Sequence, residues 1–170
     1  VALCDVDRNH LERKAAELKS EGIAVSTHSD LRRVCDDKDI DAVIVATPNH
    51  WHALATVWAC QAGKDVYVEK PVSYTIWEGR QMVAAARKYG RVVQAGTQAR
   101  SSPVLREAQA WLERGELGAL RFARIILYRQ RSGIGRTAGP VEVPAGVDYD
   151  LWCGPAAKTR AMLSLTLATG

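Results

Sequence analysis

The stretch "DAVIVATPNHWHALATVWACQAGKDVYVEKPVS", residues 41–73, contains two short apolar runs with a helical pattern between them. The first run, within residues 40–47, is the clearest candidate for a buried strand, and the second covers residues 65–69. Residues 50–62 form the expected helix, which Gly63 ends in a left-handed conformation. Strands joined through a helix run parallel with a right-handed crossover. The stretch therefore predicts a doubly wound α/β fold, a parallel sheet covered by helices on both faces.

The same alternation of strand and helix patterns continues on both sides of this stretch. The further elements we expect are a strand at 1–5, a helix that stops near Gly22, a short helix capped by Ser29, a helix at 76–89 whose start carries a capping box of Thr75 and Glu78, a strand at 91–96, and a helix with Pro103 at its first position. After residue 118 the short alternation of strand and helix patterns ends, and a longer strand pattern at 120–129 is followed by a Gly- and Pro-rich stretch. We therefore expect a second domain to begin between residues 98 and 118.

Composition excludes several classes of function. The net charge is +4, with Lys and Arg scattered among acidic residues, so no basic stripe indicates a nucleic-acid partner. No apolar run approaches the ~20 residues of a membrane helix. The four cysteines lack the pair spacing of a metal site and are interpreted as reduced structural thiols. We expect a cytoplasmic protein without a metal, although the chain begins inside a strand pattern, which leaves export of a longer parent protein open.

Polar and ionisable residues gather at the carboxyl ends of the predicted strands. These ends lie on one edge of a parallel sheet, and ligands bind in the crevice just outside that edge. The residues concerned are Asp5, then Thr47-Pro48-Asn49 with His50 and His52 behind them, then Glu69-Lys70-Pro71, and finally Gly96-Thr97-Gln98 with Arg100 behind them.

Three of these groups have both a structural and a functional interpretation. Asp5 could cap the following helix, or it could accept both ribose hydroxyls of an adenosine and repel a 2′-phosphate, which favours NAD over NADP. The positive charge of Arg8 nearby reduces that preference for NAD. Asn49 could be the N-cap of the next helix, and its turn could still approach a cofactor. His52, in the first turn of that helix, is on general grounds more often a packing residue than a catalyst.

Lys70 is harder to explain as a structural residue. A strand flanked by helices offers little water to an ammonium group unless the strand ends at a crevice. There the ammonium can donate a hydrogen bond to a substrate hydroxyl or assist its proton transfer. Pro71 restricts the backbone of the preceding residue and permits a cis peptide bond, so that it fixes where Lys70 points. Lys70 is therefore the candidate catalytic residue.

Three motifs resemble one known family. Thr47-Pro48-Asn49-His50-Trp51-His52, Ala62-Gly63-Lys64 and Glu69-Lys70-Pro71 are similar, in residues and in spacing, to the T-P-N-x-x-H turn, the A-G-K helix end and the E-K-P strand end of the Gfo/Idh/MocA oxidoreductases. The resemblance covers roughly residues 1–158, including "DYDLWCGPA", which is similar to a segment of a sugar-acting branch.

The resemblance implies a Rossmann-type, partial NAD(P)-binding domain at 1–98 and the start of an α/β substrate and oligomerisation domain at 99–170. It implies hydride transfer between a sugar or cyclitol carbinol carbon and nicotinamide, with NAD as cofactor more than NADP, in a homo-oligomeric parent protein. It also implies a cis Lys70–Pro71 bond. The residues implied to contact the cofactor are Asp5, Thr47, Pro48, Asn49, His52, Glu69, Lys70 and Gln98, and those implied to contact the substrate are Lys70 and Arg100.

Two parts of the family pattern are absent from this sequence. The family's first strand and its G-x-G-x-x-G turn would precede residue 1, and the Asp and His that accompany the lysine in the second domain have no counterpart after residue 158. We therefore expect a fragment without the first strand that is inactive by itself. Two alternatives stay open for the parent protein, an NAD-dependent glycosidase on the same fold and a non-catalytic sugar or dinucleotide sensor. Net NADH production from a free sugar would indicate the dehydrogenase, and aryl-glycoside hydrolysis without net NADH production would indicate the glycosidase. Neither activity would indicate the sensor.

Overall fold

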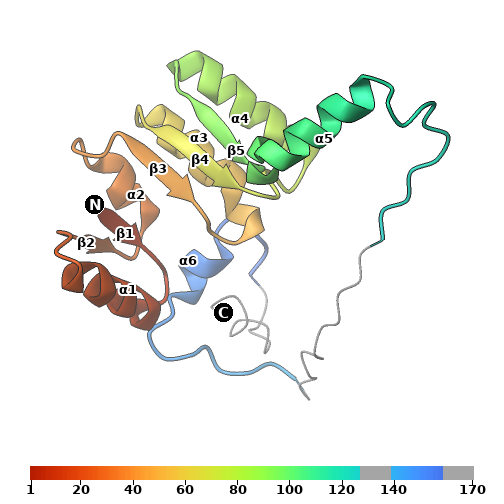
Figure 1. The fold of residues 1–170 in the computed structure, drawn as a ribbon. Coiled ribbons are helices and arrows are strands. Elements are labelled where there is room, and N and C mark those ends of the chain that lie inside the picture. The colour runs from red at the N-terminus through yellow and green to blue at the C-terminus, as the bar shows by residue number, and fades with distance from the viewer. Residues whose placement is uncertain (127–138, 159–170) are drawn as a thin grey trace. The chain divides into compact units, whose positions relative to one another are not determined.

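The computed structural model describes residues 1–126 and 139–158 (Figure 1). These residues belong to two compact units. The first unit combines residues 1–96 with residues 139–158, and the second contains residues 97–126.

Strands and helices alternate along the first unit. Its elements are β1 (Ala2–Cys4), α1 (Arg8–Ser20), β2 (Ser26–His28), α2 (Leu31–Asp36), β3 (Ala42–Val45), the 3₁₀ helix η1 (Asn49–Trp51), α3 (His52–Gln61), β4 (Asp65–Glu69), α4 (Ile76–Tyr89), β5 (Val93–Gly96) and α6 (Tyr149–Cys153). The second unit contains the 3₁₀ helix η2 (Gln98–Ser101) and α5 (Pro103–Glu113). The predicted α/β alternation is confirmed. The sequence did not predict β2, whose three polar residues carry no apolar signal, or the short helices η2 and α6.

The strands form two separate parallel sheets, β1 with β2 and β3-β4-β5. In the doubly wound order 3-2-1-4-5-6, β2 and β1 take the places of strands 3 and 2, and β3, β4 and β5 take those of strands 4, 5 and 6. Among the described residues no strand takes the central first place. Consequently β1 and β3 each have one edge that pairs with no described strand.

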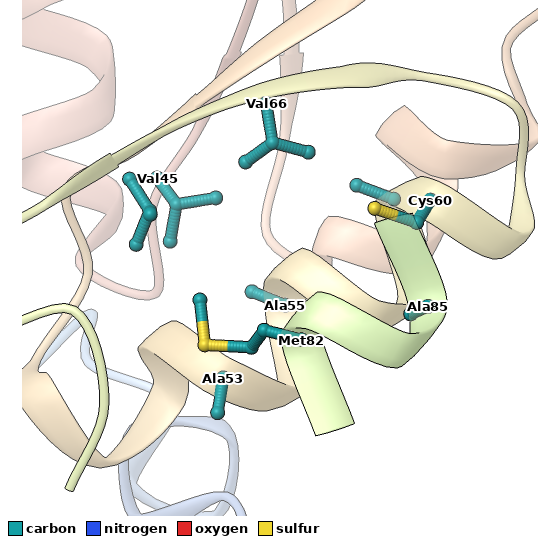
Figure 2. Close-up of a cluster of buried hydrophobic side chains, with 9 residues drawn as sticks. Val45, Ala53, Ala55, Cys60, Val66, Met82 and Ala85 are labelled. Carbon is teal, nitrogen blue, oxygen red and sulfur yellow. The ribbon is translucent and has the colours of Figure 1, made fainter. Parts of the chain in front are cut away.

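The main core lies between the three-stranded sheet and the helices α3 and α4, which pack on one of its faces (Figure 2). Alanines on α3 keep that helix close to the valines of β3 and β4. The buried residues are Val45, Ala53, Ala55, Ala59, Cys60, Val66, Val68, Met82 and Ala85.

The expectation that helices cover both faces of the sheet is wrong for β3. Side chains alternate along a strand, so Val45 is buried against α3 and α4 while Ile44 points to the opposite face, where it is 76% exposed. The apolar run in β3 predicted two covered faces, but the described helices cover one.

Local signals explain most helix ends. The Thr75 hydroxyl accepts the Glu78 N–H and the Glu78 carboxylate accepts the Thr75 N–H, which confirms the capping box of α4. Pro103 is the first residue of α5, and Gly63 has φ +80°, both as predicted. The cap of α2 is Asp30 and not Ser29, because the Asp30 carboxylate accepts the Arg32 N–H.

One further expectation differs from the structure. Residues 120–126 of the predicted strand at 120–129 are irregular and exposed, because no described strand lies beside them to form a ladder, and the rest of that pattern lies outside the described residues.

No helix within residues 1–126 and 139–158 has the length and apolar composition that crossing a bilayer requires.

Candidate functional site

A cavity of about 470 Å³ lies at the carboxyl ends of β1 and β3, in the first unit. Four segments far apart in the sequence line it: the turn after β1, the start of α2, the turn after β3, and part of residues 144–154. The lining residues are Asp5, Val6, Asp7, His10, Ser29, Asp30, Leu31, Ala46, Thr47, Pro48, Asn49, Trp51, Val147, Leu151 and Trp152. The cavity therefore brings together four of the predicted site residues, Asp5, Thr47, Pro48 and Asn49.

Asp5 is half-buried, and neighbours orient its carboxylate. Its Oδ1 accepts the Asp7 N–H at 2.9 Å, and its Oδ2 lies 2.7 Å from His10 Nδ1. The cap of α1 is Asp7, whose carboxylate accepts from the N–H groups of Asn9 and His10. Asp5 is therefore not the helix cap. Each of its oxygens keeps a second lone pair, so the carboxylate can still accept hydrogen bonds from a ligand.

Thr47 lines this cavity and also carries an unsatisfied hydroxyl. Its Oγ1 is buried, and no described group is its hydrogen-bond partner. A buried polar atom without a partner is uncommon in native proteins. Since Thr47 lines the cavity, a polar group of a bound molecule would satisfy the hydroxyl.

The helix that follows this turn begins differently from the expectation. Asn49 is the first residue of η1 and not an N-cap, because the Trp51 N–H donates to the Pro48 carbonyl at 2.9 Å. The Asn49 side chain makes no capping bond, and it is exposed at the cavity.

The cavity is acidic. Asp5, Asp7 and Asp30 contribute carboxylates, and the side-chain hydrogen bond from Arg32 lowers the pKa of Asp30. Arg32 is exposed and does not line the cavity, and its guanidinium forms an ion pair with the Asp30 carboxylate. Such a lining favours hydroxyl and amide donors over an additional phosphate. Together with the unpartnered Thr47 hydroxyl, these acceptors fit the adenosine ribose of a dinucleotide.

His52 lies behind the turn and not in the cavity lining. It is 1% exposed, and its ring nitrogens contact two backbone carbonyls: Nδ1 lies 2.6 Å from Pro71 O and Nε2 lies 2.8 Å from Thr47 O. A neutral imidazole can donate one of these hydrogen bonds, and a doubly protonated ring can donate both. His52 thus connects the segments that follow β3 and β4.

Glu69 and Lys70 lie where β4 ends. The register pairs Val45 with Val68 and Glu69 with Gly96, so β3, β4 and β5 end at the same edge of their sheet. Glu69 is half-buried, Lys70 is exposed, and the Lys70–Pro71 bond is cis, as expected. Lys70 does not line the cavity.

Gly96 allows the Glu69 side chain to lie across the neighbouring strand. A Cβ at this position would lie 3.0 Å from Glu69 Cα and 3.2 Å from its Cδ. The sequence offers one signal for this contact, a glycine at the end of an apolar strand, and its role was not predicted.

The two remaining predicted residues lie in the second unit. Gln98 and Arg100 both belong to η2 and are exposed there. Their assignment to cofactor and substrate stays a prediction.

Sequence reasoning missed several residues of the cavity. His10 on α1 holds Asp5, and Trp51 is 7% exposed with its Nε1 donating to the Leu151 carbonyl at 2.9 Å. His10 is five residues from Asp5, and Trp51 lies within the T-P-N-x-x-H motif. Nothing in the local pattern indicates Leu151 or Trp152, because they reach the cavity from about a hundred residues away.

Comparison with known proteins supplies the family. Residues 1–97 match the Gfo/Idh/MocA model, described as an oxidoreductase family with an NAD-binding Rossmann fold. The chain is 39% identical over 121 residues to inositol 2-dehydrogenase 1 of Saccharopolyspora erythraea, and this match covers 69% of the chain and 34% of that protein. It is 32% identical over 124 residues to the uncharacterized oxidoreductase YrbE of Bacillus subtilis, with coverage of 73% and 35%.

Solved structures agree with the sequence matches. The myo-inositol 2-dehydrogenase of Lactobacillus plantarum superposes with a TM-score of 0.62 at 28% identity, over 69% of this chain and 34% of that one. The WlbA dehydrogenase of Bordetella pertussis, solved with NADH and UDP-GlcNAcA, superposes with a TM-score of 0.62 at 26% identity, over 69% and 33%. The chain thus spans about a third of the length of these relatives. Because the family model covers more than half of the chain and matches its parallel α/β fold, the chain belongs to the Gfo/Idh/MocA family of oxidoreductases with an NAD-binding Rossmann fold.

Proposed function

We propose that this chain carries the cofactor-binding part of an NAD-dependent dehydrogenase that acts on a CH–OH carbon of a sugar or cyclitol. The observation that carries the proposal is the acidic cavity at the ends of β1 and β3, where Asp5 and the unpartnered Thr47 hydroxyl lie together. Relatives named as inositol 2-dehydrogenase and 1,5-anhydro-D-fructose reductase support the class of substrate.

The cavity would take the adenosine half of the cofactor. Asp5 accepts hydrogen bonds from the two ribose hydroxyls, and His10 keeps its carboxylate in place. Thr47, Pro48 and Asn49 form the facing turn, in which Thr47 Oγ1 gains the partner that it lacks. His52 supports this turn from behind through the Thr47 carbonyl. A 2′-phosphate would meet the Asp5 carboxylate, which favours NAD over NADP.

Chemistry is proposed at the edge formed by the ends of β4 and β5. Nicotinamide, when bound, supplies the hydride acceptor or donor at its C4 position. Glu69 lies on the nicotinamide side, and the exposed Lys70 ammonium donates to the reacting hydroxyl and assists its proton transfer. Gln98 and Arg100 serve cofactor and substrate, respectively.

The domain division follows the same reasoning. We propose that residues 1–98 are a partial NAD(P)-binding domain and that residues 99–170 begin a substrate and oligomerisation domain. Because the chain spans about a third of its relatives, we propose that it binds the cofactor without turning over a sugar by itself, and that the whole protein is a homo-oligomer of the cytoplasm.

Calorimetric titration with NAD, NADP and ADP-ribose tests this function on the purified chain. We expect NAD and ADP-ribose to bind and NADP to bind more weakly. Replacing Asp5→Ser should weaken NAD roughly tenfold and reduce the preference over NADP, while Asp39→Ser, an exposed carboxylate outside the cavity, should leave both affinities unchanged. Equal effects of the two substitutions, or no binding of NAD to the unmodified chain, would refute the assignment.

A further inference from the structure

Residues 144–154, which we call the docked segment, bind both the turn after β1 and the turn after β3. These two turns follow strands of separate sheets. At the turn after β1, the Arg8 N–H donates to Gly146 O at 3.0 Å and the Asp148 N–H donates to Val6 O at 2.9 Å. Asn9 Nδ2 donates to Ala145 O at 3.0 Å. At the turn after β3, Trp51 Nε1 donates to Leu151 O, and His50 Nε2 lies 2.8 Å from Trp152 O.

The side chains of the docked segment have a different task from its backbone. Every hydrogen bond named above reaches a backbone group of the segment, so none of these bonds engages its side chains. Three of them, Val147, Leu151 and Trp152, line the cavity. They add an apolar wall to a cavity whose other walls carry Asp5 and the Thr47 turn. An apolar wall beside polar acceptors suits a flat heteroaromatic base attached to a ribose.

We propose that the docked segment is a wall of the cofactor cavity, and that docking of the segment and binding of the adenosine half of a dinucleotide stabilise each other. This inference rests on the proposed function for the identity of the ligand. Its physical basis is linkage: a ligand that contacts the segment only when it is docked must favour the docked state by the same factor by which docking favours the ligand.

Gly154 lies outside the cavity lining, and a substitution there offers a way to undock the segment. A Cβ at Gly154 would lie 2.1 Å from Cε2 and 2.2 Å from Cζ2 of Trp51, the side chain that holds Leu151. Gly154→Ala therefore cannot keep the segment against Trp51. Gly139→Ala is the matched control, because nothing lies within 4 Å of a Cβ at that position.

A second, milder variant protects the test against a variant that fails to fold. Asn9 is exposed, and Asn9→Ala removes the side-chain bond to the Ala145 carbonyl while leaving the backbone bonds of the segment in place. It should shift affinity in the same direction as Gly154→Ala and by a smaller factor. Thermal unfolding followed by circular dichroism shows whether each variant keeps the core of α3 and α4.

The experiment combines ADP-ribose titration with amide hydrogen exchange on the full 170-residue chain. We expect Gly154→Ala to weaken ADP-ribose roughly tenfold or more, with Gly139→Ala unchanged. In the unmodified chain, ADP-ribose should slow exchange of the Arg8 and Asp148 amides, because their hydrogen bonds join the docked segment to the turn after β1. Equal affinity of the Gly154→Ala variant and the unmodified chain would overturn the coupling and leave the cofactor site intact. No binding to the unmodified chain would overturn the proposed function and the coupling together.

Discussion

His52 contributes to the site through the backbone and not through direct contact with the cavity. Its two ring nitrogens face the carbonyls of Thr47 and Pro71, and the side chain is almost fully buried. The motif containing His52 was recognisable in the sequence, but its partner across the edge was not, because the contact with Pro71 arises only once β3 and β4 lie side by side.

Replacing His52→Ala should destabilise the chain by roughly 2–4 kcal/mol, because it removes the buried imidazole that contacts the Thr47 and Pro71 carbonyls and opens a cavity beneath the turn. Urea unfolding would measure this. His50→Ala is the comparison, since His50 is half-buried and bonds one carbonyl, and it should cost less. Equal costs for the two variants would contradict a supporting role that is specific to His52.

Cys4 should be an unreactive thiol near neutral pH. The residue has exposed surface, but its thiol is desolvated and lies near Asp30 and Asp5, and these effects raise the pKa to about 12. The thiolate is the reactive form, so its fraction at pH 8 is about a thousandfold below that of an ordinary thiol.

Alkylation of Cys4 by iodoacetamide, followed by mass spectrometry, would check this. The rate should rise with pH well beyond pH 9 in the folded chain, and the same cysteine in the urea-unfolded chain should react rapidly at pH 8. Rapid modification of the folded chain at pH 8 would be inconsistent with a desolvated thiol.

Among the elements, α4 shows how far local signals can determine a structure. Its observed range, Ile76–Tyr89, is the predicted one, because a capping box begins it and Gly90 ends it with φ +62°. The pattern at 120–129 has comparable apolar content but irregular structure at 120–126. A helix forms its hydrogen bonds within itself, whereas a strand needs a neighbour.

Removing the cap of α4 should have a measurable cost. Thr75→Ala leaves the Glu78 N–H without its acceptor and should lower the free energy of unfolding by about 1 kcal/mol. Thr75→Ser keeps the hydroxyl and should cost much less. Because Glu78 accepts from Thr75 in return, the Thr75→Ala and Glu78→Ala costs should not be additive in a double-mutant cycle.

At the scale of the whole chain, the two sheets of the first unit differ in how well they are supported. β4 pairs with strands on both sides and packs against α3, whereas β1 and β2 pair only with each other over three residues. Two-stranded sheets are marginal by themselves.

Amide hydrogen exchange should therefore be uneven across the first unit. The amides of Val66 and Val68 should exchange roughly tenfold or more slowly than those of β1 and β2. Uniform protection over both sheets would mean that the first unit opens only as a whole. NMR or mass spectrometry on the purified chain gives the rates.

The sequence could predict the alternation, the edge and the turn of this site, since each rests on signals within a few residues. It could not predict the wall formed by Leu151 and Trp152, because that contact joins segments about a hundred residues apart and is held by backbone carbonyls, which leave no trace in residue identity. The open face of β3 was also unpredictable, since an apolar run does not say whether its second face finds a cover.

The unpaired edges of β1 and β3 have a practical consequence for handling the protein. In the part of the chain that the structure describes, no strand pairs with either edge, and Ile44 exposes an apolar side chain beside one of them. Edges of this kind recruit strands from other molecules. Concentrated stocks of this chain will tend to self-associate, so dilute solutions and early checks by light scattering suit its purification.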